Sequence, residues 1–368
     1  MIVGVTKEIK THEYRVGMLP VAAELLTRKG HSALVERGAG LGSGFSDEEY
    51  AAAGAEIVSE AAEIFAKADL IVKVKEPQPV EIEMLREGQI LFTYLHLAAD
   101  RELTTGLMKS GCIGVAYETL TNRAGQLPLL IPMSEVAGKM SVQEGAKYLE
   151  KEKGGLGVLL GGIPGVESGH VVIIGGGTVG TCAAKMAAGL GAKVRLLDVN
   201  LDRLRELDDF LPRNVSLLYS DEHTLRESLA WADLVVGAVL VPGAAAPKLV
   251  RREHLKLMKT GSVIVDVAVD QGGCCETTKP TTHDDPTFVV DGVIHYCVAN
   301  MPGAVARTST IGLNNATMPW TLRLADVGAY EIAKADPGFA AGINVDRGRL
   351  ANKPVADAHG LEYVPFGH

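Results

Sequence analysis

The segment VVIIGGGTVG at residues 171–180 limits the fold of this chain more than any other feature. Four apolar β-formers lead into three glycines, and an alanine-rich helical pattern follows them. A chain can turn tightly beside a pyrophosphate only where no Cβ atoms intervene, and Gly175, Gly177 and Gly180 have the G-x-G-x-x-G spacing. The segment therefore predicts a strand, a turn and a helix that together bind a dinucleotide.

A second strand-like segment, AKVRLLD at residues 192–198, ends in an acid 23 residues after Gly175. An acid at this place accepts hydrogen bonds from ribose hydroxyls, while the amides and dipole at the helix N-terminus hold the pyrophosphate. Asp198 favours NAD over NADP, because a carboxylate repels a 2′-phosphate and no Arg or Lys follows it immediately. The alternative is a close-packed strand–helix–strand crossing without a ligand.

The length and composition indicate two domains rather than one. The chain has 368 residues, of which 47% are hydrophobic and 22% charged, which is typical of a well-packed protein. Its net charge of −9 and the lack of a basic stripe argue against a nucleic-acid partner. The start IVGVTKE is unlike a secretory signal, and no apolar run approaches the roughly 20 residues of a membrane span. We therefore expect a cytoplasmic protein with no membrane partner.

The cysteines do not form a recognisable framework. Their number, five, is odd and their spacing is scattered, which favours reduced thiols over disulfides or a zinc site. We accordingly expect no bound metal.

Strand-like and helix-like segments alternate along most of the chain. This alternation predicts an α/β fold of two doubly wound, Rossmann-like domains with a cofactor and substrate cleft between them. We expect residues 1–131 and 307–368 to form one discontinuous, substrate-binding domain, and residues 132–306 to form the dinucleotide domain. A long helix that begins at Ser134, a plausible N-cap, is expected to link the two.

Three residues of the first part could handle a substrate. Arg15 lies in an early loop where a guanidinium could clamp a carboxylate, Lys75 ends the segment DLIVKVK, and His96 ends GQILFTYLH. Ligands of open α/β sheets gather beyond the carboxyl ends of strands, so Lys75 and His96 can share one crevice. Arg15 and Lys75 could instead be solvated charges, and His96 a hydrogen-bonded core residue.

Acids in the segment SVIVDVAVDQGGCCE offer a further catalytic group. Asp270 is expected at a strand end, where a carboxylate could order a water or stabilise a cationic intermediate. Asp266 is the competing choice, and we expect it to lie within the strand and to make a structural hydrogen bond. Ser134 could bond a cofactor phosphate as well as cap its helix.

Taken together, these segments resemble the NAD-dependent L-alanine dehydrogenases of bacteria over nearly the full length. The stretches that carry the resemblance include KEIKTHEYRVGMLP, VKVKEP, YLHLA, PLLIPMSEVAGKMSVQEGA, VVIIGGGTVG, GSVIVDVAVDQGGCCE and VDGVIHYCVANMPGAVARTST. The resemblance implies that Arg15 and Lys75 bind the substrate and that His96 and Asp270 are the catalytic pair. It also implies L-alanine, pyruvate and ammonium as the substrates and a homohexamer as the assembly.

The same resemblance implies a set of residues that contact NAD. Besides Gly175, Gly177 and Gly180, these are Ser134, Thr178, Val179, Asp198, Arg203, Ser220, Val239, Leu240, Val267, Asp270, Val298, Ala299, Asn300 and Met301. Some relatives carry an acid and a histidine on the late helix as a metal site, whereas this chain has Arg323 and Val327 in that region.

Two other functions remain open at the level of the sequence. One is an NAD-binding module like that of the proton-pumping transhydrogenases, which reduces no small substrate. The other is a related amino-acid or opine-type dehydrogenase with a larger substrate pocket.

Overall fold

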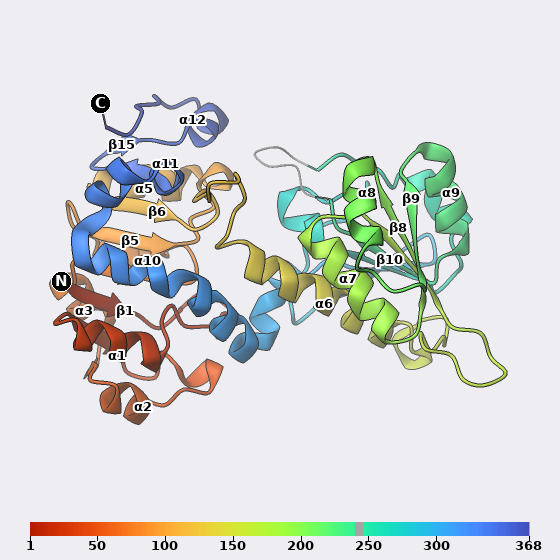
Figure 1. The fold of residues 1–368 in the computed structure, drawn as a ribbon, viewed down its shortest axis with the longest axis horizontal. Helices are drawn as coiled ribbons and strands as arrows, with labels where there is room; N and C mark the ends of the chain where they lie inside the picture. Colours follow the sequence, from red (N-terminus) through yellow and green to blue (C-terminus); the bar gives the residue numbers. More distant parts are fainter. Residues whose placement is uncertain (240–245, 368) are drawn as a thin grey trace. The chain divides into compact units, whose positions relative to one another are not determined.

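The computed structural model describes residues 1–239 and 246–367. This part of the chain forms two compact units: residues Met1–Met133 with Val305–His368, and residues Ser134–Ala304. The sequence had placed the boundaries after residues 131 and 306. Each unit is built around one mostly parallel sheet with helices on its faces (Figure 1), so the predicted α/β fold is confirmed.

The first unit contains, among the described residues, an eight-stranded sheet in the order β15-β14-β6-β5-β4-β1-β2-β3. Strands β1 to β6 are parallel and alternate with helices. Their order 3-2-1-4-5-6 is that of a Rossmann sheet, whose ligands bind beyond the carboxyl ends of the strands. The elements are β1 (Ile2–Val5), α1 (Pro20–Arg28), β2 (Ser32–Glu36), α2 (Asp47–Ala52), β3 (Glu56–Val58), α3 (Ala61–Lys67), β4 (Leu70–Val72), α4 (Pro79–Ile82), β5 (Ile90–Thr93), α5 (Arg101–Ser110) and β6 (Ile113–Ala116).

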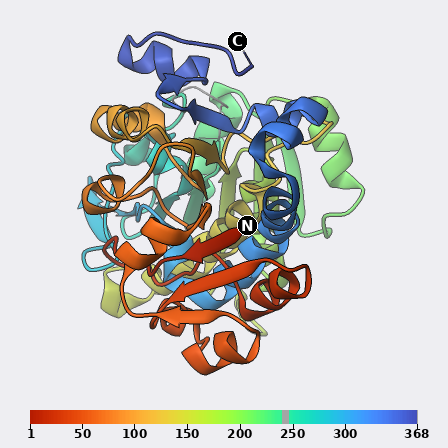
Figure 2. The ribbon, with the colours of Figure 1, turned by 90° about the vertical axis from the view of Figure 1, so that its left-hand side faces the viewer.

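The end of the chain completes this first sheet. Strand β14 pairs antiparallel with β6, and β15 pairs antiparallel with β14. The preceding long helix α10 packs against α1 and β4, and Figure 2 shows these blue elements beside the red and orange ones of the N-terminal segment. The elements are α10 (Ala306–Ala335), α11 (Pro337–Ala340), β14 (Ile343–Asp346), β15 (Arg349–Leu350) and α12 (Lys353–His359).

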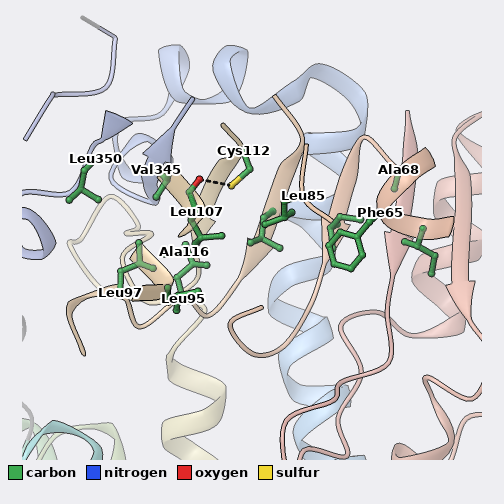
Figure 3. Packing of buried hydrophobic residues seen from close by; sticks show 14 of the residues in the cluster. Phe65, Ala68, Leu85, Leu95, Leu97, Leu107, Cys112, Ala116, Val345 and Leu350 are labelled. Carbon is green, nitrogen blue, oxygen red and sulfur yellow. Dashed lines mark hydrogen bonds between the residues drawn. The ribbon is translucent and has the colours of Figure 1, made fainter. Parts of the chain in front are cut away.

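Buried apolar residues of both chain segments form the core on one side of this sheet. Phe65 and Leu107 pack in the same cluster as Val345 and Leu350, which belong to the C-terminal strands (Figure 3). In this cluster the thiol of Cys112 donates to the carbonyl oxygen of Leu107. The return of the chain is therefore fixed by apolar packing as well as by strand pairing.

The second unit contains, within its described residues, a seven-stranded sheet in the order β12-β13-β11-β10-β7-β8-β9. All neighbours are parallel except the hairpin of β12 and β13. Neither β9 nor β12 was predicted from the sequence. The elements are α6 (Ile131–Tyr148), β7 (His170–Ile174), α7 (Thr178–Gly189), β8 (Lys193–Asp198), α8 (Leu201–Asp208), β9 (Val215–Tyr219), α9 (Glu222–Trp231), β10 (Leu234–Gly237), β11 (Val263–Asp266), β12 (Thr287–Val290) and β13 (Val293–Tyr296).

Short 3₁₀ helices make several of the connections in both units. They are η1 (Leu41–Ser43), η2 (Leu97–Ala99), η3 (Lys151–Lys153), η4 (Arg252–Leu257), η5 (Val267–Gln271) and η6 (Met301–Val305). Among the described helices, none combines the length and the apolar character that crossing a bilayer requires.

Candidate active site

The candidate substrate residues of the first unit follow three strands at their carboxyl ends. Arg15 lies between β1 and α1, Lys75 follows β4, and His96 follows β5. Two expectations need correction, because β4 ends at Val72 and β5 at Thr93. Lys75 and His96 are therefore loop residues three positions beyond their strands, where side chains are free of the sheet's alternation.

Arg15 is a buried charge and not a solvated one. Its exposed fraction is 2%, and its guanidinium makes a bidentate contact with Glu13 along one edge, Nε to Oε1 at 2.7 Å and Nη2 to Oε2 at 2.6 Å. Its Nη1 donates to the sulfur of Met133 at 3.0 Å. Although burial opposes the charged form, the hydrogen bonds from Arg15 to Glu13 raise the pKa of Arg15. A permanent positive charge is thus fixed in this loop.

Lys75 is held by its backbone. The carboxylate of Glu8 accepts from the backbone N–H of Val74 at 2.6 Å and of Lys75 at 3.3 Å, and the carbonyl of Lys75 accepts from Oγ1 of Thr93 at 2.9 Å. Burial lowers the pKa of the Lys75 ammonium, and the nearby positive charge of Arg15 lowers it further. Lys75 and Arg15 therefore interact electrostatically, which places them in one neighbourhood.

A buried ion cluster that the sequence analysis missed is centred on Lys73, two residues before Lys75. The ammonium of Lys73 is fully buried and contacts Glu81 at 2.8 Å and Glu8 at 3.2 Å. Burial acts against the charge of Lys73, but the two carboxylates raise its pKa above the ordinary value. Lys73 thus anchors Glu8, the carboxylate that positions the backbone of Lys75. The signal in the sequence was a lysine inside an apolar run, DLIVKVK, which needs a buried acid as a partner.

His96 has an unusual backbone and two acidic neighbours. Its φ of 50° lies in the left-handed region, and its backbone N–H donates to Oε1 of Glu118 at 2.6 Å. Its ring Nδ1 lies 3.4 Å from Oε2 of Glu76, and the imidazole ring stacks on the ring of Tyr94. With its side chain 46% exposed, His96 is not a core histidine. A strained, hydrogen-bonded backbone of this kind is common where a side chain must be aimed.

In the second unit, the glycine-rich turn follows β7 as predicted. Gly175 has a φ of 104°, and a Cβ on Gly180 would lie 1.8 Å from the carbonyl oxygen of Gly175. Gly177 differs, because a Cβ there would meet no protein atom within 4 Å, although Gly177 is the N-cap of α7. Two of the glycines thus serve the close crossing of strand and helix, and the third leaves open space at the helix N-terminus. Thr178 and Val179 begin that helix.

Asp198 ends β8 and supports this turn. One carboxylate oxygen accepts from the backbone N–H of Gly176 at 2.6 Å and the other from that of Asn200 at 2.8 Å. Arg203 braces the turn from α8, since its Nε donates to the carbonyl of Gly176 at 2.9 Å and its Nη2 to Thr181 at 3.1 Å. Both side chains are therefore fixed to the backbone of the glycine turn.

The other cofactor residues proposed from the sequence follow strands of the same sheet. Ser220 directly follows β9, Val239 lies after β10, and Val267 begins η5 after β11, while residues 298–301 lie after β13. Val298 and Met301 are buried, and Ala299 and Asn300 are half-buried. Leu240 lies outside the described residues. Ser134 needs correction, because α6 already begins at Ile131 and Ser134 is inside its first turn and not its N-cap.

The two acids near β11 lie at positions that differ from those expected. Asp270 is exposed in η5, four residues beyond the strand and not at its end. Asp266 is the last residue of β11 and not mid-strand, but it does make structural hydrogen bonds. Its buried carboxylate accepts from the backbone of Ala268 at 3.1 Å and Cys275 at 3.2 Å, and from Oγ1 of Thr278 at 2.7 Å.

Asp266 also lies beside two thiols. Its ligand atoms and those of Cys274 and Cys275 all lie within 4.8 Å of one another, and all three residues are buried. The thiol of Cys274 points to the carboxylate at 3.6 Å. Hydrogen bonds thus account for the positions of these groups, and the local structure is a polar anchor for the turn after β11.

Carboxylates that hold other groups in place are the main residues that sequence reasoning missed. Glu13 grips Arg15, Glu8 holds the Lys75 backbone, and Glu76 and Glu118 contact His96. Their signal in the sequence was weak, because each is a single acid in a loop or at a segment end. Glu13 lies two residues from Arg15, but the other three acids meet their partners only in the folded chain.

Comparison with known proteins shows the family to which this chain belongs. The model of the alanine dehydrogenase/PNT N-terminal domain matches residues 4–137, and that of the C-terminal domain matches residues 141–353. An alanine dehydrogenase of Halomonas elongata is 56% identical over 364 residues, which are 99% of this chain and 98% of that protein. An alanine dehydrogenase of Bacillus subtilis is 53% identical over 366 residues, 99% of this chain and 96% of that protein.

Solved structures show the same relation. A structure of an L-alanine dehydrogenase is similar with a TM-score of 0.95 and 50% identity, covering 98% of this chain and 99% of that one. A transhydrogenase from Sinorhizobium meliloti is more distant, with a TM-score of 0.81 and 26% identity over 96% of this chain and 99% of that one.

Proposed function

Because the chain belongs to the alanine dehydrogenase family, we propose that it catalyses the reversible oxidative deamination of L-alanine. In this reaction alanine, NAD⁺ and water give pyruvate, ammonium, NADH and a proton. One observation of the structure supports the proposal most. Arg15, Lys75 and His96 all follow strands of the first unit at their carboxyl ends, and a carboxylate contacts the side chain of Arg15, the backbone of Lys75 and the ring of His96.

The second unit is proposed to bind NAD. The open space at Gly177, at the N-terminus of α7, suits the close approach of a pyrophosphate, so the residues present fit this cofactor. Asp198 would accept hydrogen bonds from the adenosine ribose, since each of its carboxylate oxygens has a second lone pair beyond its backbone partner. When bound, NAD accepts a hydride from Cα of alanine. The contact residues we propose are Ser134, Gly175, Gly177, Thr178, Val179, Gly180, Asp198, Arg203, Ser220, Val239, Leu240, Val267, Asp270, Val298, Ala299, Asn300 and Met301.

Arg15 and Lys75 are proposed to bind the substrate carboxylate and carbonyl. Arg15 supplies a charge that Glu13 keeps in one place, so little side-chain entropy is lost when an anion binds. Lys75 supplies a second cation that is mostly withdrawn from water, which strengthens its attraction for an anion. Two fixed cations would orient a small keto acid rather than only attract it.

His96 and Asp270 are proposed as the groups that move protons. Loss of a hydride from Cα leaves an iminium, which a water molecule attacks to give pyruvate and ammonium. Asp270 would orient and deprotonate that water and favour the cationic imine, and His96 would exchange a proton with the developing carbonyl oxygen. By resemblance we also propose a cytoplasmic homohexamer.

The proposal is tested by assaying the purified protein for NADH oxidation with ammonium and a panel of 2-keto acids. We expect the highest kcat/KM with pyruvate, and a strong preference for NADH over NADPH because Asp198 repels a 2′-phosphate. NADH binding without oxidation in the presence of any keto acid would support a transhydrogenase-like module instead. A preference for a larger keto acid, or for an alkyl amine in place of ammonium, would support the opine-type alternative.

A further inference from the structure

Glu76 contacts two side chains through its carboxylate. Its Oε1 pairs with the ammonium of Lys10, and its Oε2 lies 3.4 Å from Nδ1 of His96. The carboxylate itself is 14% exposed, whereas the imidazole is 46% exposed. Burial acts to raise the pKa of Glu76, but the hydrogen bonds with His96 and Lys10 and the charge of Lys75 lower it to about 2. Glu76 is therefore ionised at any pH at which the protein works.

The other contacts of His96 fix its backbone and the plane of its ring, but not which edge of the ring points outward. Glu118 holds the backbone N–H at 2.6 Å, and Tyr94 stacks on the ring with 5.8 Å between centroids. An imidazole rotated by a half-turn about its Cβ–Cγ bond would keep both contacts, because that torsion is broad and nearly two-fold. Among the residues that the structure describes, only Glu76 makes a contact that distinguishes the two ring orientations, since a flipped ring would present a carbon to Oε2.

We infer that Glu76 is a positioning residue for the reaction proposed above, on which this inference rests. Its carboxylate accepts a hydrogen bond from Nδ1–H of His96, so that Nε2 is the ring atom that exchanges a proton with the substrate. Glu76 thereby sets the tautomer of the neutral ring and stabilises the ring when it is protonated. Lys10 holds the other oxygen and keeps the carboxylate from rotating away.

The charged and titratable groups around His96 come from four segments of the first unit. They are Lys10 on the loop after β1, Lys75 and Glu76 after β4, Tyr94 beside His96 after β5, and Glu118 after β6. Removing the charge of Glu76 therefore leaves the His96 ring without the anion that faces its Nδ1. Protonation of His96 becomes less favourable, so the pH at which its protonation controls the rate must fall.

The test compares the Glu76→Gln enzyme with the unaltered one in kcat/KM for pyruvate as a function of pH. We expect a loss of about 3- to 10-fold at the optimum, because a charge-assisted hydrogen bond at a half-exposed site becomes neutral. The limb of the profile that depends on His96 should move about 0.5 to 1 pH unit toward acid. The control is Glu63→Gln, the same chemical change at an exposed ion pair with Lys67, for which neither quantity should change.

A double mutant separates this effect from one exerted through Lys75. In a His96→Ala background, Glu76→Gln should cause no further loss, because the two residues act through one contact. An equal loss in both backgrounds would overturn the inference, and so would an unchanged profile in the single mutant. If His96→Ala is inactive while Glu76→Gln is normal, only the inference fails. If His96→Ala has normal activity, the proposed role of His96 fails as well.

A measurement on the unaltered protein does not depend on how the variants fold. In protein labelled with ¹⁵N at histidine, the signals that disappear in His96→Gln identify the His96 ring. We expect the neutral ring to carry its proton on Nδ1, with a lone pair on Nε2. A ring protonated on Nε2 would overturn the inference.

Discussion

The two units share the strand order of a Rossmann sheet, but they build their candidate sites from different materials. The first unit uses polar side chains with acidic partners, as Glu13 holds Arg15 and Glu76 contacts His96. The second unit uses the backbone of the turn at residues 175–180, where the essential property is the lack of side chains. Both sites lie beyond the carboxyl ends of parallel strands.

This difference follows from what each ligand demands. A small anionic substrate offers few atoms, so it must be recognised by cations in fixed positions, and buried cations need acidic partners to remain charged. A dinucleotide phosphate can be bound by backbone N–H groups, which need no charged side chain but require close approach. The first site should therefore be sensitive to loss of charge and the second to added volume.

The largest effect on stability is expected from adding one methyl group to the second site. In Gly180→Ala the Cβ would lie 1.8 Å from the carbonyl oxygen of Gly175, so backbone must move. We expect a destabilisation of about 1–3 kcal/mol or more and a loss of NADH binding of at least about 100-fold. Thermal unfolding measures the destabilisation, and a fluorescence titration with NADH measures the loss of affinity.

The matched control is Gly177→Ala in the same turn. Its Cβ would meet no protein atom within 4 Å, and its φ of −67° suits alanine, so the thermal midpoint should not fall. NADH affinity should still drop, by about 10-fold, if the open space receives the pyrophosphate. Normal NADH affinity in Gly177→Ala would place the phosphates elsewhere, and equal instability of both variants would remove the distinction between the glycines.

The largest effect on the rate is expected for the two residues that are proposed to move protons, His96 and Asp270. General acid–base residues contribute about 10²- to 10⁴-fold to the rate, so His96→Ala and Asp270→Asn should each lower kcat by this order. NADH affinity and the thermal midpoint should be retained, since both side chains are exposed. Asp270→Asn is the sharper variant because it keeps the volume and removes only the charge. Near-normal alanine oxidation at saturating NAD across pH would take Asp270 out of the mechanism.

The features of the molecule that could be predicted from the sequence depend on local patterns. The glycine spacing and the apolar run before it define β7 and the turn, because both signals lie within ten consecutive residues. The α/β class followed from the alternation of such segments. Both Rossmann-like sheets are confirmed by the strand orders.

The parts that could not be predicted depend on contacts between distant residues. Glu8 contacts Lys73 and the Lys75 backbone, which lie more than sixty positions later in the sequence. No local pattern around Glu8 indicates these partners. The strand ends were placed too late, because apolar residues such as Val74 and Leu95 continue past the sheet into buried loops. For the same reason Asp266, the true end of β11, was interpreted as mid-strand. Burial alone does not distinguish a strand from the loop that follows it.

The first unit is proposed to bind the substrate and the second to bind NAD, and Lys75→Ala tests this assignment most directly. Losing a charge-assisted contact should lower kcat/KM for pyruvate by about one to two decades while NADH affinity stays nearly unchanged. Because the pKa of Lys75 is lowered from 10.5, KM for pyruvate in the unaltered enzyme should also begin to rise below the pH at which an ordinary lysine loses its charge. That alkaline rise should be absent in the variant. If NADH affinity collapsed and pyruvate kinetics were intact, Lys75 would belong to the cofactor site. This result would contradict the assignment of the substrate to the first unit and of NAD to the second.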